Sequence, residues 1–182
     1  MKNPLLNIRP HHILRGAIYS LYAILLISFV TGFLPSFRYT AQIPDLMLCA
    51  TVAIAFFEGE RTAAVFGVLG GFALESAGSH GVCILPCFYL FCAICASALF
   101  RHALVRNYGA FMLYMCGFCL LRALISIIYI QLQYENFSLA SVIKNTLFGE
   151  WNATVISATP IFFITKFLTK KLRADRDYDQ KR

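Results

Sequence analysis

The stretch Ile43–Leu90 reads IPDLMLCATVAIAFFEGERTAAVFGVLGGFALESAGSHGVCILPCFYL, and its pattern decides the fold that we expect. It contains two apolar runs, 46–57 and 62–74, separated by a charged Glu-Gly-Glu-Arg turn. Pro44 and Asp45 predict the start of the first helix, because proline has no N–H to leave unbonded in a first turn and the helix dipole favours a carboxylate there. The stretch therefore predicts two consecutive short helices.

Small residues recur along the second of these helices at intervals of four. They are Ala63, Gly67 and Gly71, and Glu75 continues the same interval. Such a seam of small residues lets another backbone approach closely, which is how helices associate in lipid. Glu75 is expected near the seam, facing protein, and the Gly- and Ser-rich segment 76–81 is expected to end the helix.

Composition indicates an integral membrane protein with one domain. Hydrophobic residues make up 59% of the 182 residues and charged residues 14%, against about 25% charged in ordinary soluble domains. The mean hydropathy is +0.67. A chain of this length has no room for a soluble domain beside a bundle of membrane helices.

We expect an all-α bundle of six transmembrane helices, two of them short. A helix of about 20 residues crosses a bilayer, so the two short helices would end in a polar recess lined by protein; a re-entrant hairpin is the alternative. Residues 137–147 show the spacing of an interfacial helix, and Pro160 predicts a bend in the last span. The expected spans are 13–33, 44–57, 62–75, 82–100, 108–130 and 152–168, followed by a basic tail, 169–182.

The positions of the basic residues predict the orientation. With six crossings, nearly all of the 16 Lys and Arg residues fall on one side of the membrane. Only Arg38 and Lys144 fall on the other side, and Arg122 lies inside the fifth span. Positive charge is typical of the cytoplasmic side, so both termini are expected there, with the tail near anionic lipid. This arrangement leaves no basic patch for nucleic acid, despite the net charge of +7.

Arg122 is the main candidate for a functional or structural site. Ionisable groups at membrane depth are costly and are usually paired or functional. Ser126, Tyr129 and Gln133 fall on the same face of the fifth helix and extend a polar stripe. Glu75 is expected about 20 Å from the cytoplasmic end, as is Arg122. A structural ion pair, a partner-binding or gating site, and a substrate or proton site in a recess that Asp45 also borders are the possible interpretations.

Metal, cofactor and catalytic sites are not expected. Two Cys-x-x-Cys pairs, 92–95 and 116–119, have metal-ligand spacing, but both lie inside apolar spans without a neighbouring His or carboxylate, where cysteine behaves as a small hydrophobe. Ser79 and His80 are adjacent in sequence, and neighbouring side chains rarely converge for proton transfer. We therefore expect a protein that is not an enzyme and has neither metal nor cofactor.

The central stretch resembles the rod shape-determining MreD family. The resemblance lies in Ile43-Pro44-Asp45-Leu46, the short charged turn, and the glycine-rich helix that ends in an acid before a Gly-Ser-His-Gly turn. The family commonly has Asp where this chain has Glu75. Outside 43–90 the chain matches only in hydropathy.

The resemblance implies a non-enzymatic scaffold or regulator of cell-wall elongation in the bacterial inner membrane. Its implied partners are a bitopic MreC-like protein and, in the same complex, MreB, RodA and penicillin-binding protein 2. The family fold is similar to that of the substrate-binding subunits of energy-coupling-factor transporters. An alternative function is therefore binding of a small, vitamin-like molecule in an outward-facing pocket; an intramembrane enzyme is the third and least favoured class.

Overall fold

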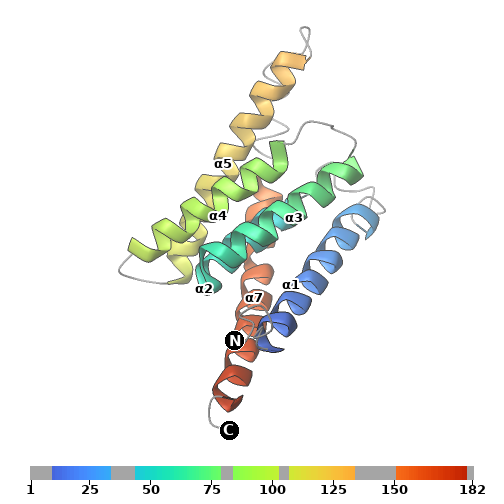
Figure 1. The fold of residues 1–182 in the computed structure, drawn as a ribbon. Coiled ribbons are helices and arrows are strands. Elements are labelled where there is room, and N and C mark those ends of the chain that lie inside the picture. The colour runs from blue at the N-terminus through green and yellow to red at the C-terminus, as the bar shows by residue number, and fades with distance from the viewer. Residues whose placement is uncertain (1–9, 34–43, 79–83, 103–106, 134–150, 180–182) are drawn as a thin grey trace, which may run out of the picture.

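A computed structural model of the chain describes residues 10–33, 44–78, 84–102, 107–133 and 151–179, and every regular element in these ranges is a helix (Figure 1). The expected all-α class is confirmed for this part of the chain, and the interfacial helix expected at 137–147 lies outside it. The elements are α1 (Pro10–Ser28), the π-helical turn η2 (Phe29–Phe33), α2 (Leu46–Glu58), α3 (Glu60–Gly78), α4 (Ile84–His102), α5 (Tyr108–Gln133) and α7 (Trp151–Asp179).

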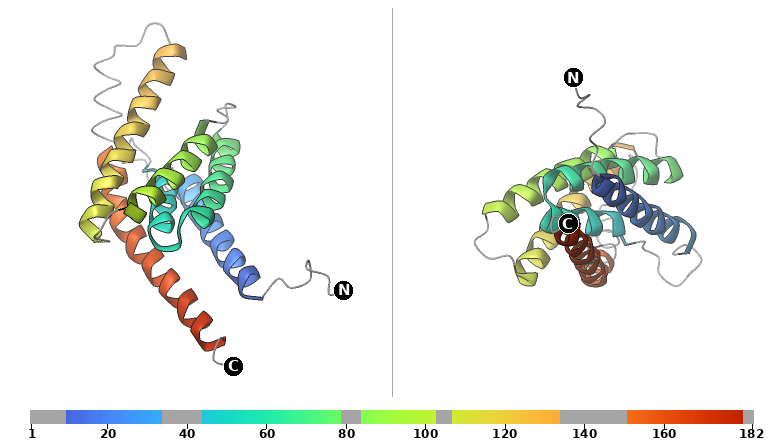
Figure 2. Two further views of the ribbon diagram at one scale, coloured as in Figure 1. Left: turned by 60° about the vertical axis from the view of Figure 1, so that its left-hand side comes forward. Right: turned by 60° about the horizontal axis from the view of Figure 1, so that its bottom comes forward.

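Helix α2 forms the centre of the bundle. Every residue from Leu46 to Phe56 is buried, as expected for a helix that is apolar all round. The helices α1, α3, α4, α5 and α7 contact it, and it lies among them in both views of Figure 2. The ring of Phe56 packs against Phe100, Phe111 and Phe162, with ring centroids 4.7, 6.2 and 5.6 Å apart. One short helix thus organises three longer ones.

Three differences from the expected helix boundaries change how the bundle is built. Helix α2 begins at Leu46, with Asp45 as its N-cap, so Pro44 precedes the helix instead of opening its first turn. Helix α3 has 19 residues and is about 28 Å long, so its prediction as a short helix is wrong. Gly59, with φ at +96°, makes the whole α2–α3 turn, which leaves Glu60 free to begin the next helix.

The third difference concerns the basic tail. Helix α7 continues through Pro160 and ends at Asp179, so most of the segment expected as a tail beyond the last span is helical. Hydrogen bonds fix its direction: the hydroxyls of Tyr19 and Thr169 lie 3.5 Å apart, and those of Tyr22 and Thr165 lie 3.2 Å apart. These pairs make α1 and α7 antiparallel, so α1 begins where α7 ends (Figure 1).

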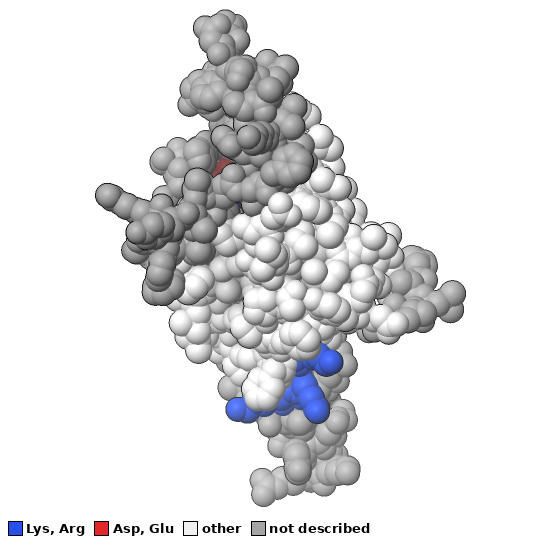
Figure 3. Space-filling model, turned by 180° about the vertical axis from the view of Figure 1, so that it is seen from behind, with Lys and Arg blue, Asp and Glu red and all other residues white. Residues whose placement is uncertain are grey.

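The described basic residues gather at this same end of the bundle, which we call the basic end. It consists of the start of α1, the α2–α3 turn, the end of α4 and the end of α7. In Figure 3 the blue side chains lie at one end of the face shown, below a broad white surface. Arg122, toward the opposite end, is the exception within the described ranges. Among the residues whose side chains the structure describes, the basic end carries Arg61, Arg101, Lys166, Lys170 and Lys171.

The small-residue seam of α3 lies inside the bundle. Ala63 is fully buried. A Cβ atom added to Gly67 would lie 3.0 Å from Thr51 Cγ2 in α2, and one added to Gly71 would lie 2.7 Å from the backbone Cα of Pro86 in α4. The close approach expected for this seam is therefore made to α2 and α4 of the same chain.

Among the residues that the structure describes, two helices are long and apolar enough to cross a membrane. They are Ile84–Arg101 within α4 and Tyr108–Ile128 within α5, and the shorter stretches Gly16–Gly32 and Leu46–Glu58 are also apolar. Large hydrophobic side chains are exposed on α1, α3, α4, α5 and α7; Leu113 and Ile156 are 72% and 74% exposed. Length and composition make α4 and α5 compatible with a membrane protein.

Candidate functional site

A buried carboxylate, that of Asp45, is the centre of the most connected polar group in the described structure. Asp45 is the N-cap of α2, and its Oδ1 accepts a hydrogen bond from the N–H of Leu48 at 3.0 Å. An N-cap of this kind stabilises a helix by about 1 kcal/mol. The side chain is only 2% exposed, so the charge needs further partners.

Arg122 of α5 supplies the opposite charge. Its Nη1 forms an ion pair with Asp45 Oδ2, and the arginine side chain is 29% exposed. Removing one member of a buried pair typically costs about 3–5 kcal/mol, because the remaining charge is left without compensation. The pair therefore ties α5 to the start of α2.

Tyr89 of α4 is the third member. Its hydroxyl lies 2.8 Å from Asp45 Oδ1 and 2.9 Å from Oδ2, and it donates its hydrogen to the carboxylate. The whole residue is buried. A hydrogen bond to a charged group contributes about 1.5–3 kcal/mol, and it also satisfies a phenol that would otherwise be buried without a partner.

Thr154 of α7 completes what we call the Asp45 centre: Asp45, Tyr89, Arg122 and Thr154. The backbone N–H of Asp45 donates to Thr154 Oγ1 at 3.1 Å. Below it, the thiol of Cys49 donates to the Thr154 carbonyl at 3.5 Å. Four helices thus meet at Asp45: α2, α4 and α5 at its carboxylate and α7 at its backbone N–H.

Glu75 is buried and faces protein, as expected, but its contact is not the ion pair with Arg122 that the sequence suggested. The ion pair that the structure gives Arg122 is made with Asp45, and Glu75 Oε1 instead accepts the N–H of Ile84 at 3.2 Å. Ile84 begins α4, so this contact satisfies one of the N–H groups that a helix start leaves open. Glu75 is 8% exposed, and its Oε2 has no hydrogen-bond partner among the described residues. Glu75 is a cap for α4.

The remaining predicted residues fall into two groups. Ser126 is half-buried on α5, whereas the side chains of Tyr129 and Gln133 lie outside the described part, so the polar stripe above Arg122 stays a prediction. Pro44, Ala63, Gly67 and Gly71 position helices: Pro44 precedes the Asp45 cap, and the three small residues bring α3 against its neighbours.

Sequence reasoning missed Tyr89 and Thr154. A tyrosine inside an apolar helix carries one hydroxyl that must find an acceptor when buried, and this is the signal that could have identified Tyr89. Thr154 had no comparable signal, because a threonine in an apolar helix can bond to its own backbone, as Thr51 does to the Met47 carbonyl at 2.8 Å.

The cysteines of the two Cys-x-x-Cys pairs are free thiols. Cys92 and Cys119 are buried in the core, and Cys95 and Cys116 are partly buried. No cluster of three or more His, Cys, Asp or Glu side chains suited to a metal ion occurs within the ranges that the structure describes. The contacts of the Asp45 centre hold four helices in a fixed register, which is a structural role.

Two hollows lie away from this centre. A recess of about 760 Å³ at the basic end lies between the α2–α3 turn and α4, and a groove of about 350 Å³ runs between α1 and α3.

A comparison with protein-family models, curated proteins and solved structures finds no match to this chain.

Proposed function

We propose that the chain is a multi-pass membrane scaffold of the MreD type, which organises cell-wall elongation and catalyses no reaction itself. In this proposal six helices cross the bacterial inner membrane with both termini in the cytoplasm. The sequence resemblance over 43–90 is the basis for the family. The structure adds support in the form of one fully connected buried charge and an exposed apolar surface.

The exposed apolar side chains support the bilayer as solvent. A soluble monomer rarely exposes apolar patches beyond a few hundred Å², yet here five helices carry large exposed hydrophobic residues while Asp45 and Tyr89 lie inside. Apolar outside and polar inside is the arrangement that lipid favours. The gathering of basic side chains at one end (Figure 3) is the charge asymmetry expected of a cytoplasmic face.

The observation that carries the scaffold function is the saturation of Asp45 by its own chain. A ligand-binding carboxylate should be open to its ligand, whereas Asp45 accepts from Leu48, Tyr89 and Arg122. For the same reason we favour a scaffold over a transporter subunit, in which Asp45 and Arg122 would face a pocket. A rigid framework of this kind suits a protein that holds others in place.

Crosslinking in native membranes tests this function. Photo-crosslinkers placed at the exposed positions Leu113 and Ile156 should capture a bitopic MreC-like protein, with MreB, RodA or penicillin-binding protein 2 in the same purified complex. Crosslinkers at the buried positions Ala93 and Ala158 are the matched controls and should capture none of these. Capture of a transporter's energising subunits, or thermal stabilisation by a vitamin-like molecule, would contradict the proposal and support the alternative.

A further inference from the structure

The recess at the basic end and the groove between α1 and α3 share two lining residues, Arg61 and Thr62. One hollow is polar and the other is largely apolar, so the two together have the two-part character of an amphiphile. We propose that they form one binding site for a single phospholipid with a phosphate and an ammonium in its head group, namely phosphatidylethanolamine. The proposal rests on the membrane location proposed above.

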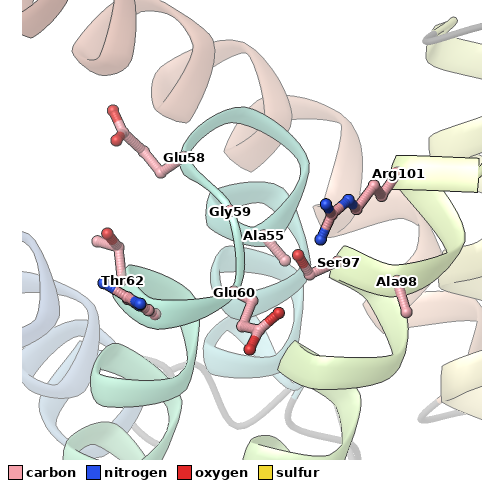
Figure 4. Close-up of a pocket in the computed structure, with 9 residues that line it drawn as sticks. Ala55, Glu58, Gly59, Glu60, Thr62, Ser97, Ala98 and Arg101 are labelled. Atoms are coloured by element: carbon pink, nitrogen blue, oxygen red, sulfur yellow. The ribbon is translucent and has the colours of Figure 1, made fainter.

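The recess offers charges of both signs. Arg61 and Arg101 line it with Glu58, Glu60 and the hydroxyl of Ser97. Figure 4 shows Arg101 directed from α4 toward the α2–α3 turn, Glu60 directed toward α4, and Glu58 directed away from Arg101. No ion pair joins Arg61, Arg101 and Glu60 to one another within the described residues, so their charges stay available to a ligand.

Charge complementarity selects the head group. Two guanidinium groups suit a phosphate diester, because arginine presents several N–H donors in a fixed fork. A carboxylate beside them suits an ammonium that can donate hydrogen bonds. The head group of phosphatidylglycerol has a phosphate for the arginines but no ammonium for Glu60, and the quaternary ammonium of phosphatidylcholine has no N–H to donate.

The groove lies between α1 and α3 and meets the lining of the recess at Arg61 and Thr62. On α3 its lining includes Val65 and Leu69, one and two turns beyond Arg61, over a rise of about 12 Å. Val65 and Leu69 are 60% and 61% exposed. On α1 the lining includes Gly16 and Ala23, whose small side chains leave room for an acyl chain. A lipid whose phosphate lies at Arg61 would place its chain in this groove.

The test measures lipid binding to the full-length, delipidated protein by native mass spectrometry and by thermal stability in detergent. Phosphatidylethanolamine, phosphatidylglycerol and phosphatidylcholine with identical chains are compared. We expect phosphatidylethanolamine to bind most tightly. Replacing both arginines (R61Q/R101Q) removes two charge-assisted contacts and should weaken its binding at least about tenfold. The variant K170Q/K171Q removes the same charge from the same end outside the recess and should bind normally.

Two further variants, one of them with a matched control, make the test specific. Glu60→Gln should abolish the preference for phosphatidylethanolamine over phosphatidylglycerol while leaving phosphate binding intact. Gly16→Leu should fill the groove and weaken binding, whereas Gly117→Leu on α5 is the control, because neither glycine has an atom within 4 Å of an added Cβ.

Equal loss in R61Q/R101Q and K170Q/K171Q would overturn the site in favour of general attraction at the basic end. Equal or tighter binding of phosphatidylglycerol would overturn the choice of head group. Alkaline extraction of membranes separates this result from the proposed function: a protein that is released was never integral, whereas a retained protein without lipid preference refutes only the lipid site.

Discussion

At the residue scale, Asp45 and Arg122 determine how the bundle is held together. The Asp45 carboxylate is almost fully buried; it accepts hydrogen bonds from α2 and α4 and forms an ion pair with Arg122 of α5. The backbone N–H of Asp45 donates a hydrogen bond to Thr154 of α7. Each contact removes part of the cost of burying a charge. The stability of the bundle should therefore depend on these few polar atoms more than on any one apolar contact.

Tyr89→Phe should destabilise the protein by about 1.5–3 kcal/mol, because it removes a hydroxyl donor from a buried carboxylate and changes little else. Thermal unfolding in a mild detergent measures the effect. Tyr108→Phe is the matched control: it removes an exposed hydroxyl contact with Thr159 and should cost less than about 0.5 kcal/mol. Equal losses in the two variants would show that the phenol of Tyr89 does not stabilise Asp45.

A double-mutant cycle should assign the partner of Arg122. We expect Asp45→Asn and Arg122→Gln to couple by about 1–3 kcal/mol, because residues in one ion pair are not additive. Glu75→Gln and Arg122→Gln should couple by less than about 0.5 kcal/mol, since Glu75 caps α4 instead. Stronger coupling through Glu75 would contradict the pairing described here.

The sequence identified the charged members of this centre but not their pairing. Asp45 and Arg122 were found because ionisable groups are rare in apolar helices and therefore conspicuous. Depth along the helix axis can be counted from the sequence. Asp45 and Glu75 lie toward the same end of the bundle, however, so depth does not determine which of the two carboxylates pairs with Arg122. The choice depends on the rotation of each helix about its axis, which only the packing of neighbours determines.

At the element scale, glycines set the distance between α3 and its neighbours. Gly71 faces the backbone of Pro86, which cannot move aside as a flexible side chain can. The interval of four predicts a close helix contact along this seam. It does not predict which helix makes that contact, because a helix of another protein and a helix of the same bundle would need the same pattern. In this chain α2 and α4 occupy it.

Gly71→Ala should destabilise the protein by about 1–3 kcal/mol, because its added Cβ would lie 2.7 Å from Pro86 Cα and force the helices apart. Gly117→Ala should be neutral or stabilising by up to about 1 kcal/mol, since it meets no atom and alanine favours helix. Unfolding temperatures of the two variants in one detergent provide the measurement. A neutral Gly71→Ala would refute the close contact.

The lengths of α3 and α7 were misjudged for a physical reason. Charged residues at 58–61 and after 168 mark the edges of apolar runs, and the Gly- and Ser-rich segment 76–81 favours a helix end near Glu75, so the sequence predicts shorter helices. Helices, however, end where hydrogen bonding or backbone conformation ends them, and Glu, Arg and Lys are good helix formers. Gly59 alone breaks the chain between α2 and α3.

At the scale of the whole molecule, the proposed topology places the basic end in the cytoplasm. A reporter that is active only in the cytoplasm should be active when fused after residue 106 or 182. A reporter that is active only outside the membrane should be active when fused after residue 40 or 140. The reason is the retention of Lys and Arg on the inner face. Activity of the residue-182 fusion on the outer side would contradict both the six crossings and the common side of the termini.

The central position of α2 also has a consequence for biosynthesis. Ribosomes make α2 about a hundred residues before α7, yet Thr154 and Phe162 of α7 complete the surroundings of Asp45 and Phe56. A nascent chain interrupted before Trp151 would lack these contacts, and its innermost helix would offer an incomplete surface to quality-control proteases. Maturation of this protein is thus delayed until α7 is made, and truncated copies that lack α7 should be degraded.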